Sequence, residues 1–387
     1  MKRIYLDNSA TTPLCPAARE AMLRAMEEFG NPSSLHAQGV AAAKLLKESR
    51  TLIGEALGER FLKEGQLVFT SCGTEASALA LLGTAYAKER RTAKTILTTD
   101  SEHPSVARTL DKLEAEGFRV VRVPTVGGAP DMDVVRAHCT PDLFMVSMML
   151  VNNETGAVYP VREVFQLARA ANPQVVCHTD AVQGFMKLPF TPRALGADLV
   201  TISAHKIGGP KGVGALFISE RMKKEKRIVP VMLGGGQEFG LRSGTENMIG
   251  IAGFAAAAGS AMSKLRTAHA HMASLRERLT AGLAGTEITV NRPANAAPHI
   301  VSITLPDIKS ETMLHYLSGQ GISVSAGSAC SAHKVGPSSV LLAFGLPSRR
   351  ADCTLRVSLS PENTAADIDA LLAALATGVS SLVRINH

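Results

Sequence analysis

The sequence predicts an α/β protein, with a mostly parallel seven-stranded sheet in a large domain and a second, smaller α+β domain. Two observations lead to this fold class. In the first two thirds of the chain, apolar runs as long as buried strands alternate with helix-length segments, which is typical of a parallel sheet covered by helices on both faces. Beyond residue 246, a long helical region and shorter elements replace this alternation. We therefore expect a large domain at residues 14–258 and a small domain formed by residues 1–13 and 259–387.

The individual elements follow from hydrophobic periodicity and from turn residues. A short strand at residues 3–6, expected to fold back onto the small domain, precedes helices at residues 16–29 and 38–57. The strands of the main sheet are expected at residues 67–70, 95–99, 119–123, 143–150, 175–178, 199–203 and 215–219. The helices between them are expected at residues 74–90, 104–116, 131–138 and 161–171. The remaining elements are a helical region at residues 246–284, extended segments at 300–305, 324 and 355–358, and helices at 310–320 and 364–382.

Composition limits the classes of function. With 45% hydrophobic and 19% charged residues, the chain resembles an ordinary soluble enzyme. The net charge of +7 is spread out, and the absence of Trp argues against stacking platforms for nucleic acid. The N-terminus lacks the pattern of a signal peptide, and no uninterrupted apolar run is long enough to span a membrane. The six cysteines are far apart, which argues against disulfides or a zinc site and fits a reducing cytoplasm. From all of these features we expect a cytoplasmic protein without membrane or nucleic-acid partners.

Lys206 is the first candidate catalytic residue. It follows the apolar run at residues 199–203 and precedes a glycine-rich turn and a second apolar run. A lysine between two apolar strands is costly to bury in its charged form, so burial should lower its pKa. A neutral, desolvated amine is a nucleophile toward aldehydes, as in Schiff-base enzymes. The alternative is a lysine that extends from the strand end into solvent.

Groups suited to a phosphate lie at the ends of two strands, where ligands bind in sheets of this class. Gly73 and Thr74 open a helix, and the free backbone N–H groups and dipole of a helix start bind phosphate. Ser203 and His205, beside Lys206, would add donors. The alternative for Thr74 is a simple helix cap.

Other strand ends carry groups suited to an aromatic heterocycle. Asp180 would be a costly buried carboxylate unless a cation, such as a protonated pyridine nitrogen, pairs with it. His103 would stack on a flat ring, and Gln183 would donate to a ring oxygen. Asn152 and Asn153 lie in the loop V-N-N-E-T-G. For each of these residues a polar turn or loop role is the alternative.

Taken together, these groups match the requirements of pyridoxal phosphate, which needs an amine for its aldehyde, a carboxylate for its pyridinium and a cradle for its phosphate. The alternative cofactor is a nicotinamide dinucleotide. That alternative is disfavoured because no G-x-G-x-x-G motif follows an early strand. We therefore predict pyridoxal phosphate.

The motifs also show a family resemblance that covers nearly the whole chain. They are S-A-H-K-I-G-G-P-K-G-V-G, H-T-D-A-V-Q, G-G-G-Q-E-F-G-L-R-S-G-T-E-N and S-A-G-S-A-C-S. The sequence resembles the cysteine desulfurases of the NifS/IscS type, in the class V aminotransferase group of fold-type-I pyridoxal-phosphate enzymes. This resemblance implies conversion of L-cysteine to L-alanine, with the sulfur donated to iron–sulfur cluster assembly or to other acceptors. It also implies a homodimer with shared active sites.

The resemblance assigns a role to each matching residue. Lys206 forms the Schiff base and moves the substrate α-proton, and Arg356 grips the substrate carboxylate with the help of Asn153. The catalytic residues that it implies are Lys206, Cys330 and His103. The cofactor-binding residues that it implies are Gly73, Thr74, His103, Asn153, Asp180, Gln183, Ser203, His205, Lys206 and Thr245. Of these, Thr245 is expected to reach the phosphate of the partner subunit.

Cys330 matches the thiol nucleophile of the family. It lies in a small, polar, aperiodic stretch that is typical of a mobile loop, with the length found in the NifS/IscS branch. The resemblance implies that its thiol attacks the substrate sulfur and then presents a persulfide to a sulfur-acceptor protein, such as an iron–sulfur scaffold. Without the resemblance, Cys330 would be read as an incidental loop cysteine.

Two residues depart from the family pattern, and two other functions stay open. Cys72 stands where glycine is common, either as a second reactive thiol or as a small residue in a tight turn. Phe239 stands where arginine is often found, in a segment that bears on the dimer contact or the pocket mouth. The first alternative function is a pyridoxal-phosphate enzyme for another amino acid, as a selenocysteine lyase or an aminotransferase. The second is a protein that acts mainly as a sulfur-relay scaffold.

Overall fold

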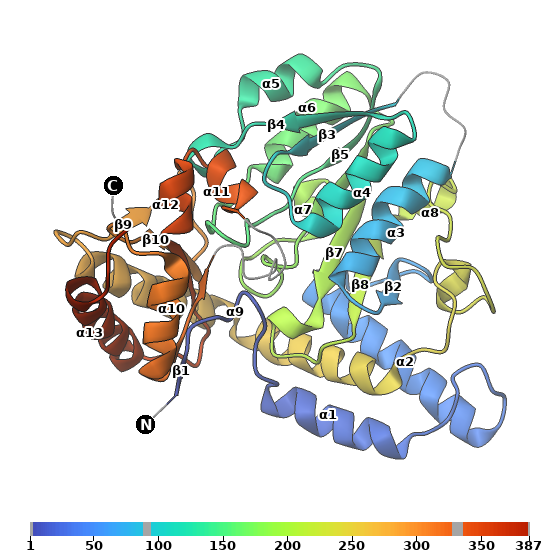
Figure 1. Ribbon diagram of the computed structural model, residues 1–387. Coiled ribbons are helices and arrows are strands. Elements are labelled where there is room, and N and C mark those ends of the chain that lie inside the picture. The colour runs from blue at the N-terminus through green and yellow to red at the C-terminus, as the bar shows by residue number, and fades with distance from the viewer. Residues whose placement is uncertain (1–2, 88–93, 327–335, 386–387) are drawn as a thin grey trace.

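The computed structural model describes residues 3–87, 94–326 and 336–385. Within these residues the strands form a seven-stranded sheet, a four-stranded sheet and a two-stranded pair. Figure 1 shows the large sheet on one side of the molecule and the smaller sheets, with the N-terminal strand, on the other. This architecture confirms the predicted fold class.

The seven-stranded sheet is mostly parallel. Its strands are β2 (Leu67–Thr70), β3 (Thr95–Thr99), β4 (Arg119–Val123), β5 (Leu143–Ser147), β6 (Val176–Asp180), β7 (Leu199–Ser203) and β8 (Gly214–Ile218). Their order is β2-β8-β7-β6-β5-β3-β4, and β8 runs antiparallel to its neighbours β2 and β7. All strands except β8 therefore end at the same edge of the sheet, where a ligand site is expected.

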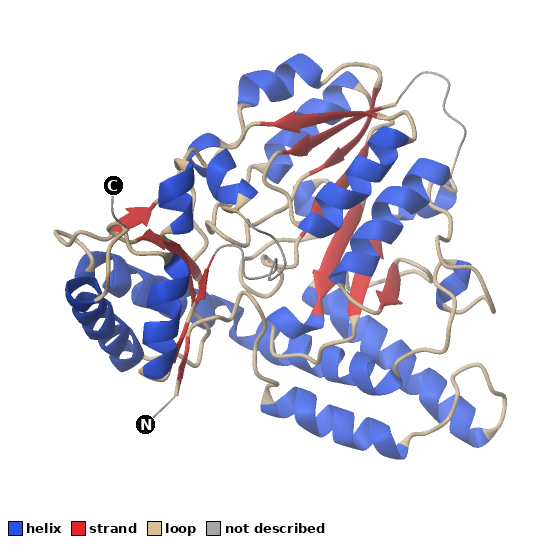
Figure 2. Cartoon of the chain, viewed as in Figure 1, coloured by secondary structure: helices blue, strands red, loops and turns tan. Residues whose placement is uncertain are grey.

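Both faces of this sheet are buried. Leu67 and Phe69 of β2 belong to one hydrophobic cluster, whereas Val68 between them belongs to another, as the alternation of side chains in a strand requires. Figure 2 shows the strands lying between helices. The helices of this part are α1 (Pro16–Glu27), α2 (Ala37–Ala56), α3 (Gly73–Tyr86), α4 (Pro104–Ala115), α5 (Met132–His138), α6 (Val161–Ala171), α7 (Pro192–Leu195), α8 (Glu220–Lys224) and α9 (Met248–Gly282).

The C-terminal part has a core of its own, which includes Ile303, Leu355 and Leu371. Its antiparallel sheet has the order β12-β13-β10-β9. The elements are β9 (Thr289–Asn291), β10 (Ile300–Thr304), α10 (Ser310–Gly319), β11 (Ile322–Ser323), β12 (Ser325–Ala326), α11 (Ser339–Ala343), α12 (Ser348–Asp352), β13 (Thr354–Ser358) and α13 (Ala365–Ser381). As expected, the first strand, β1 (Ile4–Tyr5), folds back onto this part, where it pairs in parallel with β11.

The helix α9 connects the two parts. Its residue Ala258 belongs to the core beneath the large sheet and its residue Met272 to the C-terminal core. By length and composition alone α9 would cross a membrane, but half of its apolar window is buried inside the protein, as in the core helix of a folded domain. The predicted domain boundary between residues 258 and 259 falls within this helix, so the domain limits stay a prediction.

The strand predicted at residues 143–150 is shorter in the structure, because β5 ends at Ser147. The next residues leave the sheet but stay buried, and Met149 and Val151 line the main cavity described below. The continuous apolar run therefore predicted correctly that these residues are buried, but it did not predict where the strand ends.

Candidate active site

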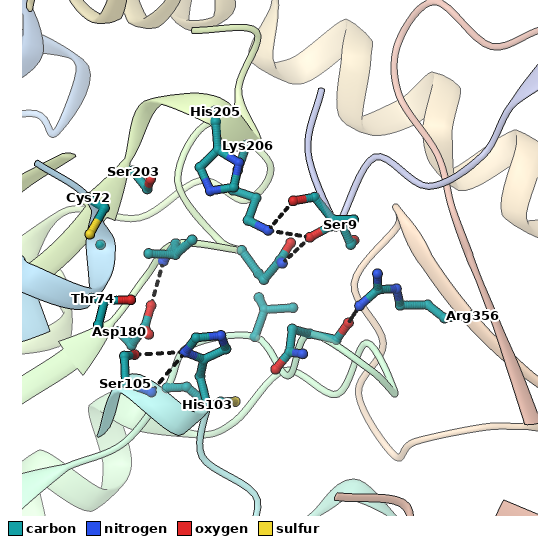
Figure 3. Close-up of a pocket in the computed structure, with 17 residues that line it drawn as sticks. Ser9, Cys72, Thr74, His103, Ser105, Asp180, Ser203, His205, Lys206 and Arg356 are labelled. Atoms are coloured by element: carbon teal, nitrogen blue, oxygen red, sulfur yellow. Dashed lines mark hydrogen bonds between the residues drawn. The ribbon is translucent and has the colours of Figure 1, made fainter. Parts of the chain in front are cut away.

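A cavity of about 260 Å³ lies at the edge of the large sheet where the parallel strands end (Figure 3). The predicted site residues that line it are Gly73, Thr74, His103, Asn153, Asp180, Gln183, Ser203, His205, Lys206 and Arg356. Thr245 is exposed and lines a separate, smaller cavity. Cys330 lies outside the described residues.

Lys206 ends a 3₁₀ turn, Ala204–Lys206, that directly follows β7. Its amine donates hydrogen bonds to the backbone carbonyls of Ser9 at 2.5 Å and Ala10 at 2.8 Å. The turn needs glycine after it, because a Cβ on Gly209 would lie 2.8 Å from the Cβ of Ala204. The lysine is thus held between the sheet and the N-terminal segment, and the predicted lowering of its pKa stays a prediction.

Asp180 is the last residue of β6 and is buried. One carboxylate oxygen accepts a hydrogen bond from the backbone N–H of Val182 at 2.9 Å. Burial raises the pKa of Asp180 to about 6, against the opposing effects of this hydrogen bond and of the Lys206 charge. A buried carboxylate of this kind gains stability from a cationic partner in the cavity.

His103 caps α4 and presents a neutral ring to the cavity. Its Nδ1 accepts a hydrogen bond from the backbone N–H of Ser105 at 3.1 Å, so the proton of the neutral ring is on Nε2. Burial, and next the charge of Lys206, lower the pKa of His103 to about 4. The ring therefore stays uncharged near neutral pH, as stacking on a heterocycle requires.

The start of α3 forms an anion cradle. Cys72 directly precedes this helix, and in the described structure its side chain accepts no hydrogen bond from the first N–H groups of the helix. The backbone is closely packed here, since a Cβ on Gly214 would lie 2.7 Å from the carbonyl carbon of Cys72. Thr74 and Ser203 line the same end of the cavity. The helix start and these hydroxyls together suit a phosphate group.

Arg356, in the middle of β13, approaches the cavity from the C-terminal part and is only 2% exposed. Its guanidinium donates to the backbone carbonyl of Asn153 at 2.8 Å and to the carboxylate of Asp7 at 3.0 Å. Its Nε has no hydrogen-bond partner in the described structure. The two bonds fix the plane of the guanidinium and leave a donor for a carboxylate ligand.

Four buried polar atoms around this cavity lack a hydrogen-bond partner within the described residues. They are Oγ of Ser9, Oδ1 of Asn153, Oγ of Ser203 and Nε of Arg356. Buried polar groups in proteins are nearly always hydrogen-bonded, so four such atoms around one cavity indicate a polar ligand. Together with Asp180 and the start of α3, they fit the ring, oxygen and phosphate groups of pyridoxal phosphate.

Several residues of the site were not singled out from the sequence. Ser9 and Ala10 act through backbone carbonyls, which no side-chain motif reveals, although they lie in the polar turn D-N-S-A-T-T-P. Glu102 precedes His103 and accepts hydrogen bonds from the backbone N–H of Met149 at 2.9 Å and the hydroxyl of Thr99 at 2.8 Å. Burial raises the pKa of Glu102 to about 8. It thus joins β3 to the segment that follows β5.

Phe239, which stands where arginine is common, covers another arginine. The guanidinium of Arg50 lies 4.9 Å from the ring centre of Phe239 and 4.8 Å from that of Phe69. Arg50 also forms a bidentate ion pair with the buried carboxylate of Glu238, at 2.7 and 2.8 Å. Phe239 has a φ of 61°, so the ion pair and the ring stacking hold a strained turn.

Comparison with known proteins gives consistent matches along the chain. Residues 4–371 match the family model described as aminotransferase class-V. The protein named cysteine desulfurase from Cereibacter sphaeroides is 39% identical over 388 residues, covering 99% of this chain and 97% of that protein. The cysteine desulfurase NifS of Azotobacter vinelandii is 36% identical, covering 96% and 91% of the two chains. A solved structure described as a NifS-like protein aligns with a TM-score of 0.91 at 35% identity, covering 98% and 100%.

Proposed function

Because the chain belongs to the class-V aminotransferase family and is a pyridoxal-phosphate-dependent cysteine desulfurase of the NifS/IscS type, we propose that its catalytic centre is the cavity beside Lys206. The family membership confirms the resemblance drawn from the motifs. One observation carries the placement of the centre: four buried polar atoms without partners surround the cavity next to a lysine amine. L-Cysteine is the proposed substrate at this centre.

The residues that would hold the cofactor follow from the chemistry of each group. Lys206 would hold it through its amine, Asp180 would face the ring nitrogen, and His103 would cover the ring. Gly73, Thr74, Ser203 and His205 would hold the phosphate, and Asn153 and Gln183 the ring oxygen. Pyridoxal phosphate, when bound, withdraws electrons from the substrate Cα and so makes the α-proton acidic.

The chain's own residues then position the substrate and move its proton. Arg356 binds the carboxylate of L-cysteine, with its guanidinium plane fixed by Asp7 and the carbonyl of Asn153. The amine of Lys206 takes the proton from the substrate Cα. The carbonyls of Ser9 and Ala10 accept hydrogen bonds from this amine and hold it at the end of β7.

Cys330 is the proposed sulfur acceptor within the enzyme, on the basis of its motif. Its thiolate attacks the sulfur of L-cysteine and forms a sulfur–sulfur bond, while the substrate carbon–sulfur bond breaks with its electron pair on Cβ. Cβ takes up a proton, so the products are L-alanine and a persulfide on Cys330. We propose that this persulfide passes to an acceptor such as an iron–sulfur scaffold protein.

The proposed homodimer has support in the position of Thr245. This residue is exposed and does not line the Lys206 cavity of its own chain, so acting on a phosphate there requires a second copy. Exposed apolar residues lie on the same loop and on the first two helices, which suits a buried interface. They are Val231, Met232 and Leu233 on the loop, and Leu23, Met26, Phe29, Leu35 and Val40 on and between α1 and α2.

The reaction is tested by spectroscopy and product assays on the purified protein. We expect absorption at about 420 nm from a lysine-bound cofactor, and release of alanine and sulfide from L-cysteine in the presence of a thiol reductant. Lys206→Ala should lose the absorption and both products. Cys330→Ser should keep the absorption and lose alanine formation, whereas the matched Cys72→Ser variant should keep both. Sustained turnover by Cys330→Ser would show that its thiol is not the sulfur acceptor.

The shared site is tested by mixing two inactive variants. In a hybrid of Lys206→Ala and Thr245→Ala chains, one of the two sites has both residues intact if each site takes its threonine from the partner. Unfolding and refolding the mixture should therefore restore activity that neither variant has alone. A mixture that stays as inactive as its components, although hybrid dimers form, would contradict the proposal.

A further inference from the structure

A second cavity of about 390 Å³ lies behind the turn that carries Lys206. The residues that follow the catalytic lysine, Ile207 and Gly208, form part of its wall. The opposite walls come from the N-terminal segment, from α9 and from the stretch between β13 and α13. None of its lining residues belongs to the catalytic cavity.

Lys187 is the unusual residue of this second cavity. It lines the wall, and the residue is only 6% exposed. Its amine makes no hydrogen bond among the described residues and is not one of the fully enclosed atoms without a partner, so it opens onto the cavity. Burial lowers the pKa of Lys187 to about 8, whereas the charge of Glu362 at the rim acts in the opposite direction. An ammonium group on a largely buried side chain is stabilised by an anion beside it, so the cavity favours an anion next to Lys187.

The polar groups around Lys187 are already engaged elsewhere. The amide of Asn363 donates to the carbonyl of Tyr5 at 3.0 Å, and that of Asn8 to the carbonyl of Ser358 at 2.9 Å. The carboxylate of Asp367 accepts the backbone N–H of Thr364 at 2.9 Å in the cap of α13. These groups hold the wall together and leave the amine of Lys187 to a ligand.

The charge around the second cavity also favours an anion. Arg3, Lys187 and Lys264 line this cavity against two carboxylates, those of Glu362, which acts on Lys187, and of Asp367, which caps α13. His299, buried nearby, has its pKa lowered by burial and next by the charge of Lys187. The positive charge of Lys187 thus acts on the buried His299, and no anionic group is bonded to Lys187 in the described structure.

We propose that the second cavity is a binding site for a small oxyanion, a carboxylate or a phosphate, which pairs with the amine of Lys187. The site is separate from the catalytic centre and goes beyond the proposed function. The cavity volume is sufficient for a small metabolite rather than for a single ion. The basic residues that line the cavity guide the anion in, and the engaged polar groups leave Lys187 as its main contact.

The first test measures the reactivity of the Lys187 amine in the holoenzyme, where the cofactor fills the catalytic phosphate site. The protein is treated briefly with acetic anhydride at pH 8, alone or with inorganic phosphate or succinate, and labelled peptides are quantified by mass spectrometry. We expect saturating anion to slow labelling of Lys187 several-fold and to leave the exposed Lys44 unchanged. Protection by phosphate alone, by succinate alone, or by both identifies the oxyanion class. Equal labelling with and without both anions would refute the proposal.

The second test uses the variant Lys187→Met, with Lys44→Met as the matched surface control. Phosphate at roughly tenfold above its dissociation constant should raise the melting temperature of the wild-type holoenzyme by about 2 °C. The shift should be lost in Lys187→Met and kept in Lys44→Met. A full shift in Lys187→Met would place the anion elsewhere. If this variant does not fold, the labelling of the wild type decides alone, and neither readout depends on turnover of L-cysteine.

Discussion

Replacing Arg356 with lysine should weaken the binding of L-cysteine while leaving the chemistry largely intact. Lysine keeps the positive charge, but it cannot bind the carboxylate of Asp7 and the carbonyl of Asn153 and still present a planar edge to a ligand. The donor that is lost is Nε, which is buried and has no partner among the described residues. The prediction therefore concerns one charge-assisted hydrogen bond to the substrate carboxylate.

The magnitude follows from the energy of such a bond. A hydrogen bond to a charged group contributes about 1.5–3 kcal/mol. Since each 1.4 kcal/mol is about a factor of ten, the KM for L-cysteine should rise by roughly 10- to 100-fold in Arg356→Lys, with kcat changed much less. Burial at 2% exposure supports the upper half of this range, because water does not replace the lost bond easily.

Initial rates of alanine formation over a range of L-cysteine concentrations measure the effect, and thermal melting of the same preparations measures the structural role of Arg356. The matched substrate is cysteine methyl ester, which has no anionic carboxylate. The KM of the wild type should be much higher for the ester than for L-cysteine. The KM of Arg356→Lys for the ester should be only a little higher than that of the wild type. A KM within twofold of the wild type would refute the reasoning. If Arg356→Lys raised the KM for the ester as much as the KM for L-cysteine, and also lowered the melting temperature, Arg356 would only hold the structure together.

Three further predictions concern the support of the site. Gly214→Ala would place a Cβ 2.7 Å from the carbonyl carbon of Cys72, and such overpacking costs about 1–3 kcal/mol. The affinity for the cofactor, measured by titration of the apoprotein, should therefore fall by roughly 10- to 100-fold. An unchanged affinity would contradict the role of this helix start as an anion cradle. The pKa of Glu102 is raised from 4.5 to about 8 in the folded state, so its carboxyl group stays protonated there while it ionises in the unfolded chain. As pH rises from 4.5 to 8, the free energy of unfolding of the wild type should therefore fall relative to that of Glu102→Gln. A difference between the two proteins in urea unfolding that stays constant with pH would contradict this. Arg50→Met removes the ion-pair partner of the buried Glu238 carboxylate, which keeps only its hydrogen bond from the backbone N–H of Phe69. The free energy of unfolding should fall by about 3–5 kcal/mol, and a loss below about 1 kcal/mol would show that the ion pair is dispensable.

Several strands of the large sheet were predictable because they are buried, rich in apolar and β-branched residues and bounded by turn residues. The strands at residues 67–70, 95–99 and 199–203 have the predicted limits for this reason. The antiparallel direction of β8 has no sequence signal, since a buried strand reads the same in both directions. The two-residue strand β11 and the single-turn helix α7 have neither a long apolar run nor a periodic pattern, so the sequence did not reveal them.

The candidate site was predictable where motif residues follow parallel strands, since those strand ends must meet at one edge. Asp180 and Lys206 are examples. Arg356 comes from the C-terminal sheet, so only the family resemblance placed it near them, and the structure brings it into the same cavity. The contacts of Lys206 with Ser9 and Ala10 could not be predicted, because they are made by backbone carbonyls and not by side chains. The roles of Thr245 and Cys330 stay predictions.

The pairing of β1 with β11 has a consequence for how the enzyme is made. Ile4 lies beside Ile322, and Asn8 is bonded to Ser358, so residues that are synthesised early find these partners only among residues that are synthesised much later. Domains fold as units during synthesis, starting from the N-terminal side. The large sheet can therefore form on the nascent chain while the Ser9 and Ala10 segment still lacks its hydrogen bond to Ser358. Because β13 supplies both Ser358 and Arg356, a prematurely ended chain carries a folded sheet without a finished catalytic centre.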